Sequence, residues 1–404
     1  MAVTAAGGWR KVLTISVPAA LVGVLVAQCA MELWVRARWD PRRGRPGFFL
    51  SDPIRGQRLA AGYDGWFAGV PVHINRLELR DPREYDLKKG PNTFRILVLG
   101  DSVTFGHGSV YEHTYPYLTE QRLKAWRPDI DWQVWNAAVP GYNTSQELGH
   151  LLEAGGRFAA DVVVVGFFKN DLVDNQPVPR PGRLRIAAYN LLSVARRHVY
   201  SLELYKQVYL TGVWRLSGSD EYRLRAEHVG VEEGLLSSAA DASALREQQL
   251  TPFERLSDEQ VRHFDCKYGM RPRPEGVRVM QRDPAFAAWV EAVRRLQQLN
   301  REGRYRIVFF VNDAPPICRE DPGTDRFYDG GSKAVDDLYL QILGDGTPAV
   351  STYDEFLHMR PSQMPNAADH SIGNSNVVKA DVLFGFLRDC VLPKLIRKAA
   401  EPSR

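Results

Sequence analysis

Three uninterrupted runs of apolar residues most strongly constrain how this chain can fold. The runs are Ile96–Leu99, Val162–Val165 and Ile307–Val311, and each contains β-branched residues. A run with no polar residue at alternate positions indicates a strand that is buried on both faces. Segments with helical spacing of apolar residues, at 114–126 and 284–300, separate the three runs. This alternation predicts right-handed βαβ units and a mainly parallel sheet that helices cover on both faces.

Weaker patterns complete the expected order of elements. Thr144 or Ser145 can cap one of the helices, because a side-chain oxygen there can accept a hydrogen bond from a free backbone N–H. A short hairpin is expected within 62–79, where glycines and aromatic residues mix with alternating apolar ones. The remaining expected elements are strands at 132–138 and 349–352 and helices at 144–158, 335–343 and 376–398.

The N-terminal segment Val12–Met31 contains twenty residues without a charge. At about 1.5 Å per residue, such a helix is long enough to cross a bilayer core of about 30 Å. A cleaved signal peptide and a buried core helix are the alternatives, but the run is longer than a usual signal core and no small-x-small cleavage site precedes Glu32. We interpret the segment as an uncleaved single-pass anchor.

The anchor divides the chain into regions with different expected roles. More basic residues follow the anchor than precede it, and by the positive-inside rule this count would place the rest of the chain in the cytoplasm. Long C-terminal domains nevertheless translocate despite nearby charge. The net charge of +4 is small for 404 residues and argues against a nucleic-acid partner. The expected regions are a tail at 1–11, the transmembrane anchor at 12–34, a linker and small β-containing lead-in at 35–93, and a main domain at 94–398 with a helical insertion at 175–282.

The insertion interrupts the alternation of strands and helices. Its stretch 184–216 is apolar and basic, and it carries five aromatic residues. We expect it to form a helical subdomain that packs these aromatic side chains on the edge of the sheet. A lid over the functional site and an amphipathic face on the membrane are the alternatives.

Ser102 follows the first apolar run directly, in the sequence Gly100-Asp101-Ser102. Open α/β sheets place their functional sites at the carboxyl ends of the strands. Three further groups occupy comparable positions: Gly141 and Asn170 follow the next two strands, and His370 precedes the last helix. Acyl transfer needs a hydroxyl, a base that takes its proton, and donors that stabilise the oxyanion. These four residues together offer such a set.

In this order the four blocks resemble the SGNH (GDSL-like) hydrolase superfamily, over about 94–174 and again over about 351–395. The resemblance implies a flavodoxin-like three-layer αβα sandwich with a five-stranded, mainly parallel sheet. It also implies Ser102 as nucleophile and His370 as base. The backbone N–H groups of Ser102 and Gly141 and the side chain of Asn170 would form the oxyanion hole, and no metal or organic cofactor is expected.

Two positions depart from the pattern of the superfamily. Phe168 stands where the third block usually begins with glycine, and Ala367 stands where an aspartate usually precedes the histidine by three residues. Three acceptors therefore remain for the Nδ1 proton of His370. Asp369 is the favoured one, a backbone carbonyl would leave a Ser–His dyad, and Asp354 is the third.

The resemblance implies a serine esterase that acts on O-acyl esters, O-acetyl groups of cell-envelope glycans above all, outside the cytoplasm (in the periplasm). Together with the N-terminal segment it predicts a membrane-anchored enzyme. An O-acyltransferase using the same site and a catalytically silent glycan-binding or scaffold protein are the alternatives. The four cysteines are too few for a disulfide framework. An oxidising compartment would nevertheless allow a disulfide between Cys266 and Cys318.

Overall fold

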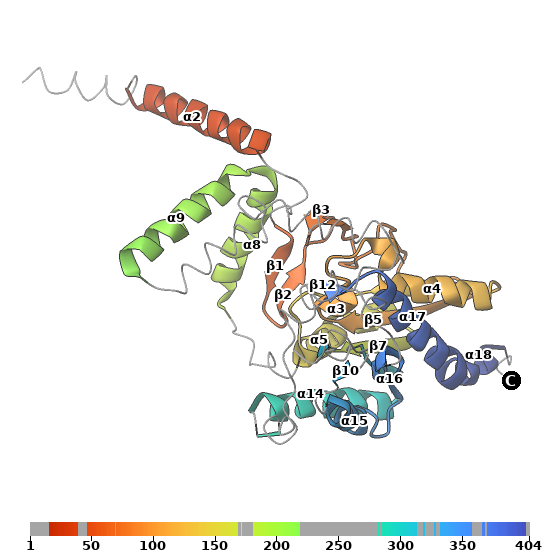
Figure 1. The fold of residues 1–404 in the computed structure, drawn as a ribbon. Helices are drawn as coiled ribbons and strands as arrows, with labels where there is room; N and C mark the ends of the chain where they lie inside the picture. The colour runs from red at the N-terminus through yellow and green to blue at the C-terminus, as the bar shows by residue number, and fades with distance from the viewer. Residues whose placement is uncertain are drawn as a thin grey trace, which may run out of the picture.

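Two parts of the chain stand out in Figure 1: a sheet surrounded by helices, and three helices that project from it. The three helices are α2 (Val17–Arg38), α8 (Arg183–His198) and α9 (Ser201–Ser217). The C-terminal helices lie at the opposite end of the molecule. The computed structural model describes residues 16–38, 47–68, 70–168, 171, 181–218, 281–282, 284–312, 318–319, 327–328, 332–357, 366–367 and 370–400.

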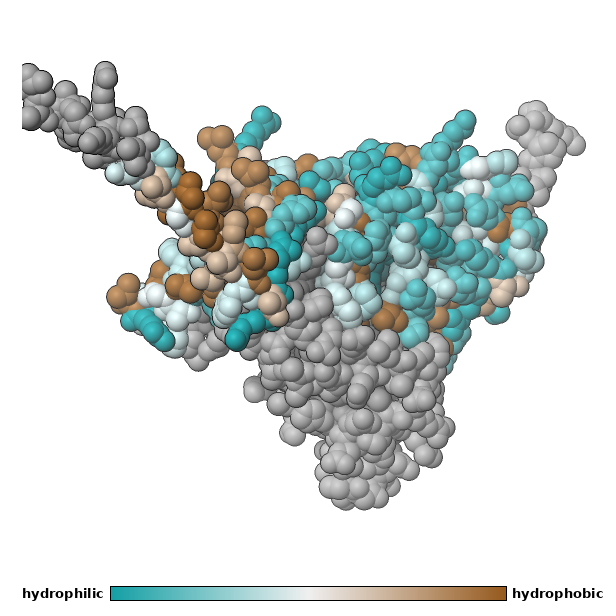
Figure 2. All heavy atoms as spheres, turned by 90° about the horizontal axis from the view of Figure 1, so that it is seen from above, coloured by the Kyte–Doolittle hydropathy of each residue, from teal (hydrophilic) through white to brown (hydrophobic). Residues whose placement is uncertain are grey.

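Helix α2 contains residues 17–31 of the apolar N-terminal segment and exposes nearly all of them. Val35 is its one buried side chain. Among the described residues, α2 is the helix whose length and composition would let it cross a membrane. It runs on to Arg38, past the expected end of the anchor at 34, and positions 12–15 lie outside the described residues. In Figure 2 apolar atoms gather over this end of the molecule, while polar atoms cover most of the remainder of that face.

The central sheet has five parallel strands, as the resemblance implied, and the alternation of strands and helices predicted its parallel arrangement. They are β5 (Thr93–Gly100), β6 (Asp131–Asn136), β7 (Val162–Phe167), β8 (Ile307–Val311) and β11 (Ala349–Ser351). Their spatial order is β6-β5-β7-β8-β11, which is the flavodoxin-like order 2-1-3-4-5. The register pairs Gly100 of β5 with Gly166 of β7, so the central strands end side by side.

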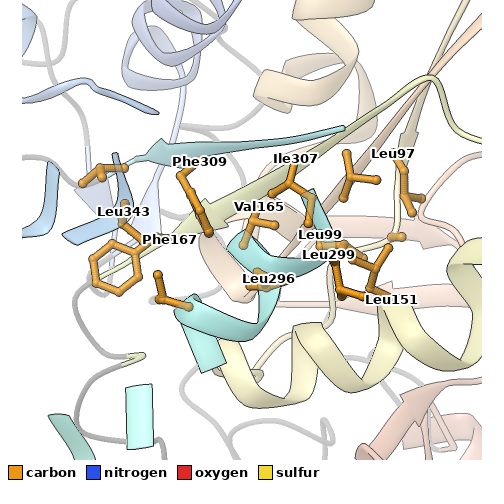
Figure 3. Packing of buried hydrophobic residues seen from close by; sticks show 14 of the residues in the cluster. Leu97, Leu99, Leu151, Val165, Phe167, Leu296, Leu299, Ile307, Phe309 and Leu343 are labelled. Atoms are coloured by element: carbon orange, nitrogen blue, oxygen red, sulfur yellow. The ribbon is translucent and has the colours of Figure 1, made fainter. Parts of the chain in front are cut away.

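Two apolar clusters, one on each face of the sheet, hold the three layers together. On one face, Leu99, Val165 and Phe309 pack against α5 (Thr144–His150), α14 (Pro284–Arg301) and α15 (Ser332–Leu343), as Figure 3 shows for part of the cluster. On the other face, Val98 and Val164 pack against α4 (Tyr115–Trp126) and α17 (Asn374–Phe386). Alternate residues of one strand therefore enter different clusters, which is why the runs needed apolar residues at every position.

The lead-in packs on the end of the sheet where β5 and β6 terminate. It forms two antiparallel hairpins, β1 (Phe49–Asp52) with β2 (Gly56–Leu59) and β3 (Asp64–Phe67) with β4 (Val70–His73). The second hairpin was predicted from the sequence, and the first was not. Their apolar side chains form a third cluster, which includes Phe105 and Tyr142 from the main domain. The lead-in is thus part of the wall around the end of β5.

Three expectations about the helices need correction. Asn143, and neither Thr144 nor Ser145, caps α5: its side chain accepts from the N–H of Gln146 in a capping box. Both the expected helix 144–158 and the closing helix are interrupted by π-helical turns, at 151–155 and 387–391. The described part of the insertion, mainly residues 181–218, contains α8 and α9. Helix α8 packs on β1 of the lead-in instead of on the edge of the five-stranded sheet. The tyrosines of α8 and α9 remain largely exposed.

Candidate active site

Ser102 begins a short helix, α3 (Ser102–Phe105), directly after the sharp turn that ends β5. The carboxylate of Asp101 accepts hydrogen bonds from the N–H groups of Val103 and Thr104, at 2.9 and 3.4 Å, so it holds the turn closed. A Cβ atom on Gly100 would lie 2.1 Å from Thr104 Oγ1, so only glycine fits there. The turn therefore fixes the backbone of Ser102 while its side chain remains partly exposed.

His370 meets Ser102 from the other end of the chain. It lies on β13 (His370–Ser371), which pairs with β12 (Asn366–Ala367), and its Nε2 is 2.7 Å from Ser102 Oγ. With the imidazole neutral and its proton on Nδ1, Nε2 accepts the hydroxyl proton of Ser102. This is the geometry that a general base needs to activate a serine hydroxyl.

The ring of His107 stacks on the ring of His370. The ring centroids are 4.2 Å apart and the planes differ by 21°. Burial, followed by the charges that His370 and Arg80 carry when protonated, lowers the pKa of His107 well below its usual value. A neutral ring therefore supports one face of His370 at neutral pH.

Arg80 and Asn376 fix the loop that carries His107. The guanidinium of buried Arg80 donates to the carbonyl of Gly106 at 2.6 Å and to that of Ser109, and Asn376 donates to Ser109 Oγ at 3.0 Å. The N–H of His107 donates to the carbonyl of Ser102 at 2.9 Å. Sequence reasoning assigned no role to Arg80 or Asn376, because nothing local marks an arginine that folds back onto a loop from 25 residues away.

A closely packed polar group lies beneath the Ser102 turn. Thr104 Oγ1 accepts from the hydroxyl of Tyr115 at 3.0 Å and from the side chain of Asn312 at 3.1 Å. Gly166 lies against all three side chains, and a Cβ there would be 2.3 Å from Thr104 Oγ1. Since Asn312 directly follows β8, this group ties the ends of β5, β7 and β8 together below Ser102.

Gly141 lies in the loop between β6 and α5, with φ at +80°, a conformation that favours glycine. The loop is attached to the end of β5, because the N–H of Val139 donates to the carbonyl of Gly100 at 3.0 Å. Gln57 of the lead-in donates to the carbonyl of Pro140 at 2.8 Å. The hydroxyl of Tyr142 donates to the carbonyl of Gln57 at 2.6 Å. Gly141 is therefore held at the same edge of the sheet as Ser102.

Three buried carboxyl groups, Asp101, Glu147 and Asp171, gather behind the turn. Burial, followed by the charge of Asp101, raises the pKa of Glu147 well above its usual value. Burial, followed by the charges of Glu147 and Asp101, does the same for Asp171. Asp171 accepts from the hydroxyl of Thr144 at 3.2 Å, so it braces the start of α5 instead of facing solvent. Among the described residues, no group of histidine, cysteine and carboxylate side chains is arranged to hold a metal ion.

The remaining candidate residues divide between described and undescribed positions. Asn170 and Asp369 lie outside the described residues, as does Cys266 and the side chain of Cys318. Asp354 lies on α16 (Tyr353–Leu357) and is exposed. The structure thus brings Ser102 and His370 together and holds Gly141 at the same edge. The oxyanion donors and the acid partner stay predictions.

Of three comparisons with known proteins, one finds proteins that are similar to this chain. No protein-family model matches it, and no curated protein matches it. Among solved structures, an acetylxylan esterase from Geobacillus stearothermophilus is similar over 73% of this chain and 93% of its own, with 11% identity and a TM-score of 0.35. An alpha/beta hydrolase enzyme from the metagenome of Lake Arreo is similar over 74% of this chain and 96% of its own, with 12% identity and a TM-score of 0.35.

A GDSL-like lipase from Bacteroides thetaiotaomicron is similar over 74% of this chain and 89% of its own, with 10% identity and a TM-score of 0.29. Likenesses of this size carry no argument about chemistry, which rests on the residues described above.

Proposed function

We propose that this chain is a membrane-anchored serine hydrolase of the SGNH type, which cleaves O-acyl esters through an acyl-enzyme on Ser102. The observation that carries the proposal is the distance of 2.7 Å between His370 Nε2 and Ser102 Oγ. These residues are 268 positions apart in the chain, so local structure cannot account for the contact. Both belong to the sequence blocks that suggested acyl transfer.

In the proposed reaction, His370 Nε2 takes the hydroxyl proton while Ser102 Oγ attacks the acyl carbon. The tetrahedral oxyanion is stabilised by the N–H groups of Ser102 and Gly141 and by the side-chain amide of Asn170. His370 then gives the proton to the departing alcohol oxygen as the ester bond breaks. Water attacks the acyl-enzyme in the second half, with His370 again as base, and the acid product and free Ser102 result.

Two features support the finer parts of the proposal. The apolar and exposed surface of α2 supports single-pass anchoring. The extracytoplasmic location of the catalytic part is proposed from the resemblance to the superfamily alone. The partial exposure of Ser102 and His370 suits acyl groups on large substrates such as envelope glycans, small O-acetyl groups in particular. An acyltransferase would use the same steps, with an acceptor alcohol in place of water.

The test is the reaction of the full chain in detergent with a fluorophosphonate probe and with p-nitrophenyl acetate. We expect labelling and hydrolysis from the wild-type chain, and loss of both from Ser102→Ala, by several orders of magnitude in rate. Ser217→Ala, at the exposed end of α9, is the matched control and should behave as wild type. Absence of labelling in the wild-type chain would favour the silent glycan-binding alternative.

A second measurement addresses the compartment. Mass spectrometry of unreduced peptides from native membranes reports whether Cys266 and Cys318 are bridged. A bridge supports an oxidising, extracytoplasmic location, whereas free thiols at both positions would count against it.

A further inference from the structure

Helix α2 contacts the start of α9 through polar side chains. The carboxylate of Glu32 accepts hydrogen bonds from the N–H groups of Tyr200 and Ser201, at 2.9 and 2.8 Å. Gln28 donates to Ser201 Oγ at 2.7 Å and accepts from the hydroxyl of Tyr205 at 2.5 Å. These contacts cap the first turn of α9, so they fix where α9 begins relative to α2.

Helices α8 and α9 form a hairpin that is hydrogen-bonded to the lead-in as well as to α2. A buried ion pair between Arg196 and Glu203 connects the two helices of the hairpin. Asn190 of α8 accepts from the N–H of Ser51 at 2.7 Å and donates to its carbonyl at 3.0 Å. The hairpin therefore links the α2 helix to strand β1, and through the lead-in to the Ser102 edge of the sheet.

The hairpin exposes apolar side chains in continuity with those of α2 (Figure 2). Leu191 is 73% exposed and Val208 is 62% exposed. The water-facing surface of a monomer rarely carries several such exposed apolar side chains in one area. Among the described residues, all the exposed large apolar side chains lie on α2, α8 or α9, apart from Ile54, Leu87 and Leu152.

The polar residues of the hairpin identify what covers this surface. Residues 183–217 contain six lysines and arginines and one carboxylate, Glu203, which is buried against Arg196. The exposed part of the hairpin is thus apolar and basic, without an acidic side chain. Tyrosines 189, 205 and 209 are exposed among the aliphatic residues. Basic residues that flank aliphatic and aromatic ones match the headgroup region of an anionic bilayer.

We propose that the α8–α9 hairpin, the segment 183–217, lies in the interface of the same bilayer that α2 spans, on the side where α2 emerges. The proposal rests on the membrane anchoring proposed above. A second copy of the chain fits this surface less well, because two such hairpins would bring basic side chains together. The hairpin sets the orientation of the sheet, and it holds the Ser102 edge at a fixed distance from the membrane surface.

Site-directed spin labelling of the full chain in vesicles of phosphatidylcholine and phosphatidylglycerol tests the proposal. In a background with all four cysteines replaced by serine, single cysteines are introduced as Leu25→Cys on α2, and as Leu191→Cys and Val208→Cys on the hairpin. Gln298→Cys, on an exposed position of α14, is the matched water-facing control. Power saturation measures the access of oxygen, which concentrates in lipid, and of a water-soluble nickel complex.

We expect the labels at 191 and 208 to lose nickel access relative to position 298 and to approach the values at position 25. A lipid-like value at 25 with water-like values at 191 and 208 would overturn the hairpin proposal and leave the anchor standing. Water-like values at 25 would overturn both. Spin–spin broadening at 208 that disappears on dilution with unlabelled chain would assign the surface to a second copy instead. Hydrolysis of p-nitrophenyl acetate by the same samples reports the esterase proposal separately.

Discussion

The sheet-centred domain and the three helices α2, α8 and α9 distribute polar and apolar side chains in opposite ways. The domain buries its apolar residues in two clusters on the faces of the sheet. The helices expose theirs and keep polar contacts between them, such as Glu32 with the start of α9 and Arg196 with Glu203. One part has the pattern of a protein in water, and the other has the pattern of helices in contact with lipid.

The contrast shows why the lead-in matters. Its β1 strand contacts α8, while its cluster includes Phe105 and Tyr142 beside the Ser102 edge. A small β-element with water-type packing thus lies between the two parts. Changes in one part should therefore leave the other largely intact, and the following predictions test this independence.

The largest expected effect is on turnover. His370→Ala removes the proposed base, so we expect kcat for an acetyl ester to fall by about 10³-fold or more. If Asp369 orients His370, Asp369→Asn should lower kcat by orders of magnitude with KM little changed. In a dyad the loss should be small. Val208→Ser on the hairpin should leave kcat in detergent at the wild-type value. Near-normal turnover of His370→Ala would remove the histidine from the mechanism.

The next effect is on the stability of the sheet domain. Trp289 is fully buried against Phe167, with ring centroids 5.1 Å apart, so Trp289→Ala should cost about 3–5 kcal/mol of unfolding free energy. Leu191→Ala, at a side chain that is 73% exposed, should change it by no more than about 0.5 kcal/mol. Urea unfolding in detergent measures both. Equal losses would show that α8 belongs to the same packed core.

A smaller, local effect is expected within the helical part. Glu203→Gln leaves the buried guanidinium of Arg196 without its ionic partner, so the hairpin should open more often. Hydrogen exchange should increase in α8 and α9 and stay unchanged in β5 and β7. Glu302→Gln, at an exposed position directly after α14, is the matched control. Faster exchange across the whole sheet would contradict the separation of the two parts.

The smallest effect depends on pH. Because burial raises the pKa of Glu147 in the folded state, the folded chain holds a proton that the unfolded chain releases as pH rises through the usual carboxyl range. The contribution of Glu147 to stability therefore decreases from about pH 4.3 upward. Glu147→Gln removes this pH-dependent loss of stability. The melting temperature of the variant minus that of wild type should therefore increase from pH 4 to pH 8. A difference that is independent of pH would show that Glu147 stays ionised.

The sequence by itself determined the sheet and the position of Ser102 in it. A run such as Val162–Val165 predicts a strand inside the sheet, because a strand that is apolar at every position must be covered on both faces. A polar turn directly after such a strand falls at the carboxyl edge, which placed Ser102 correctly in the fold. The succession of strands and helices along the chain follows from the same periodicities, within a few residues at each end. The five-stranded, flavodoxin-like arrangement was implied by the resemblance to the superfamily.

Only the tertiary structure decided which distant groups meet. Asn143 caps α5 because its backbone is extended there, while Thr144 is already helical, and spacing does not reveal this difference. The stack of His107 on His370, the return of Arg80 to the 106–109 loop, and the capping of α9 by Glu32 join segments 26 to 263 residues apart. Local periodicity reports which side of an element is apolar, but the partner of each polar group depends on where the complete chain brings it.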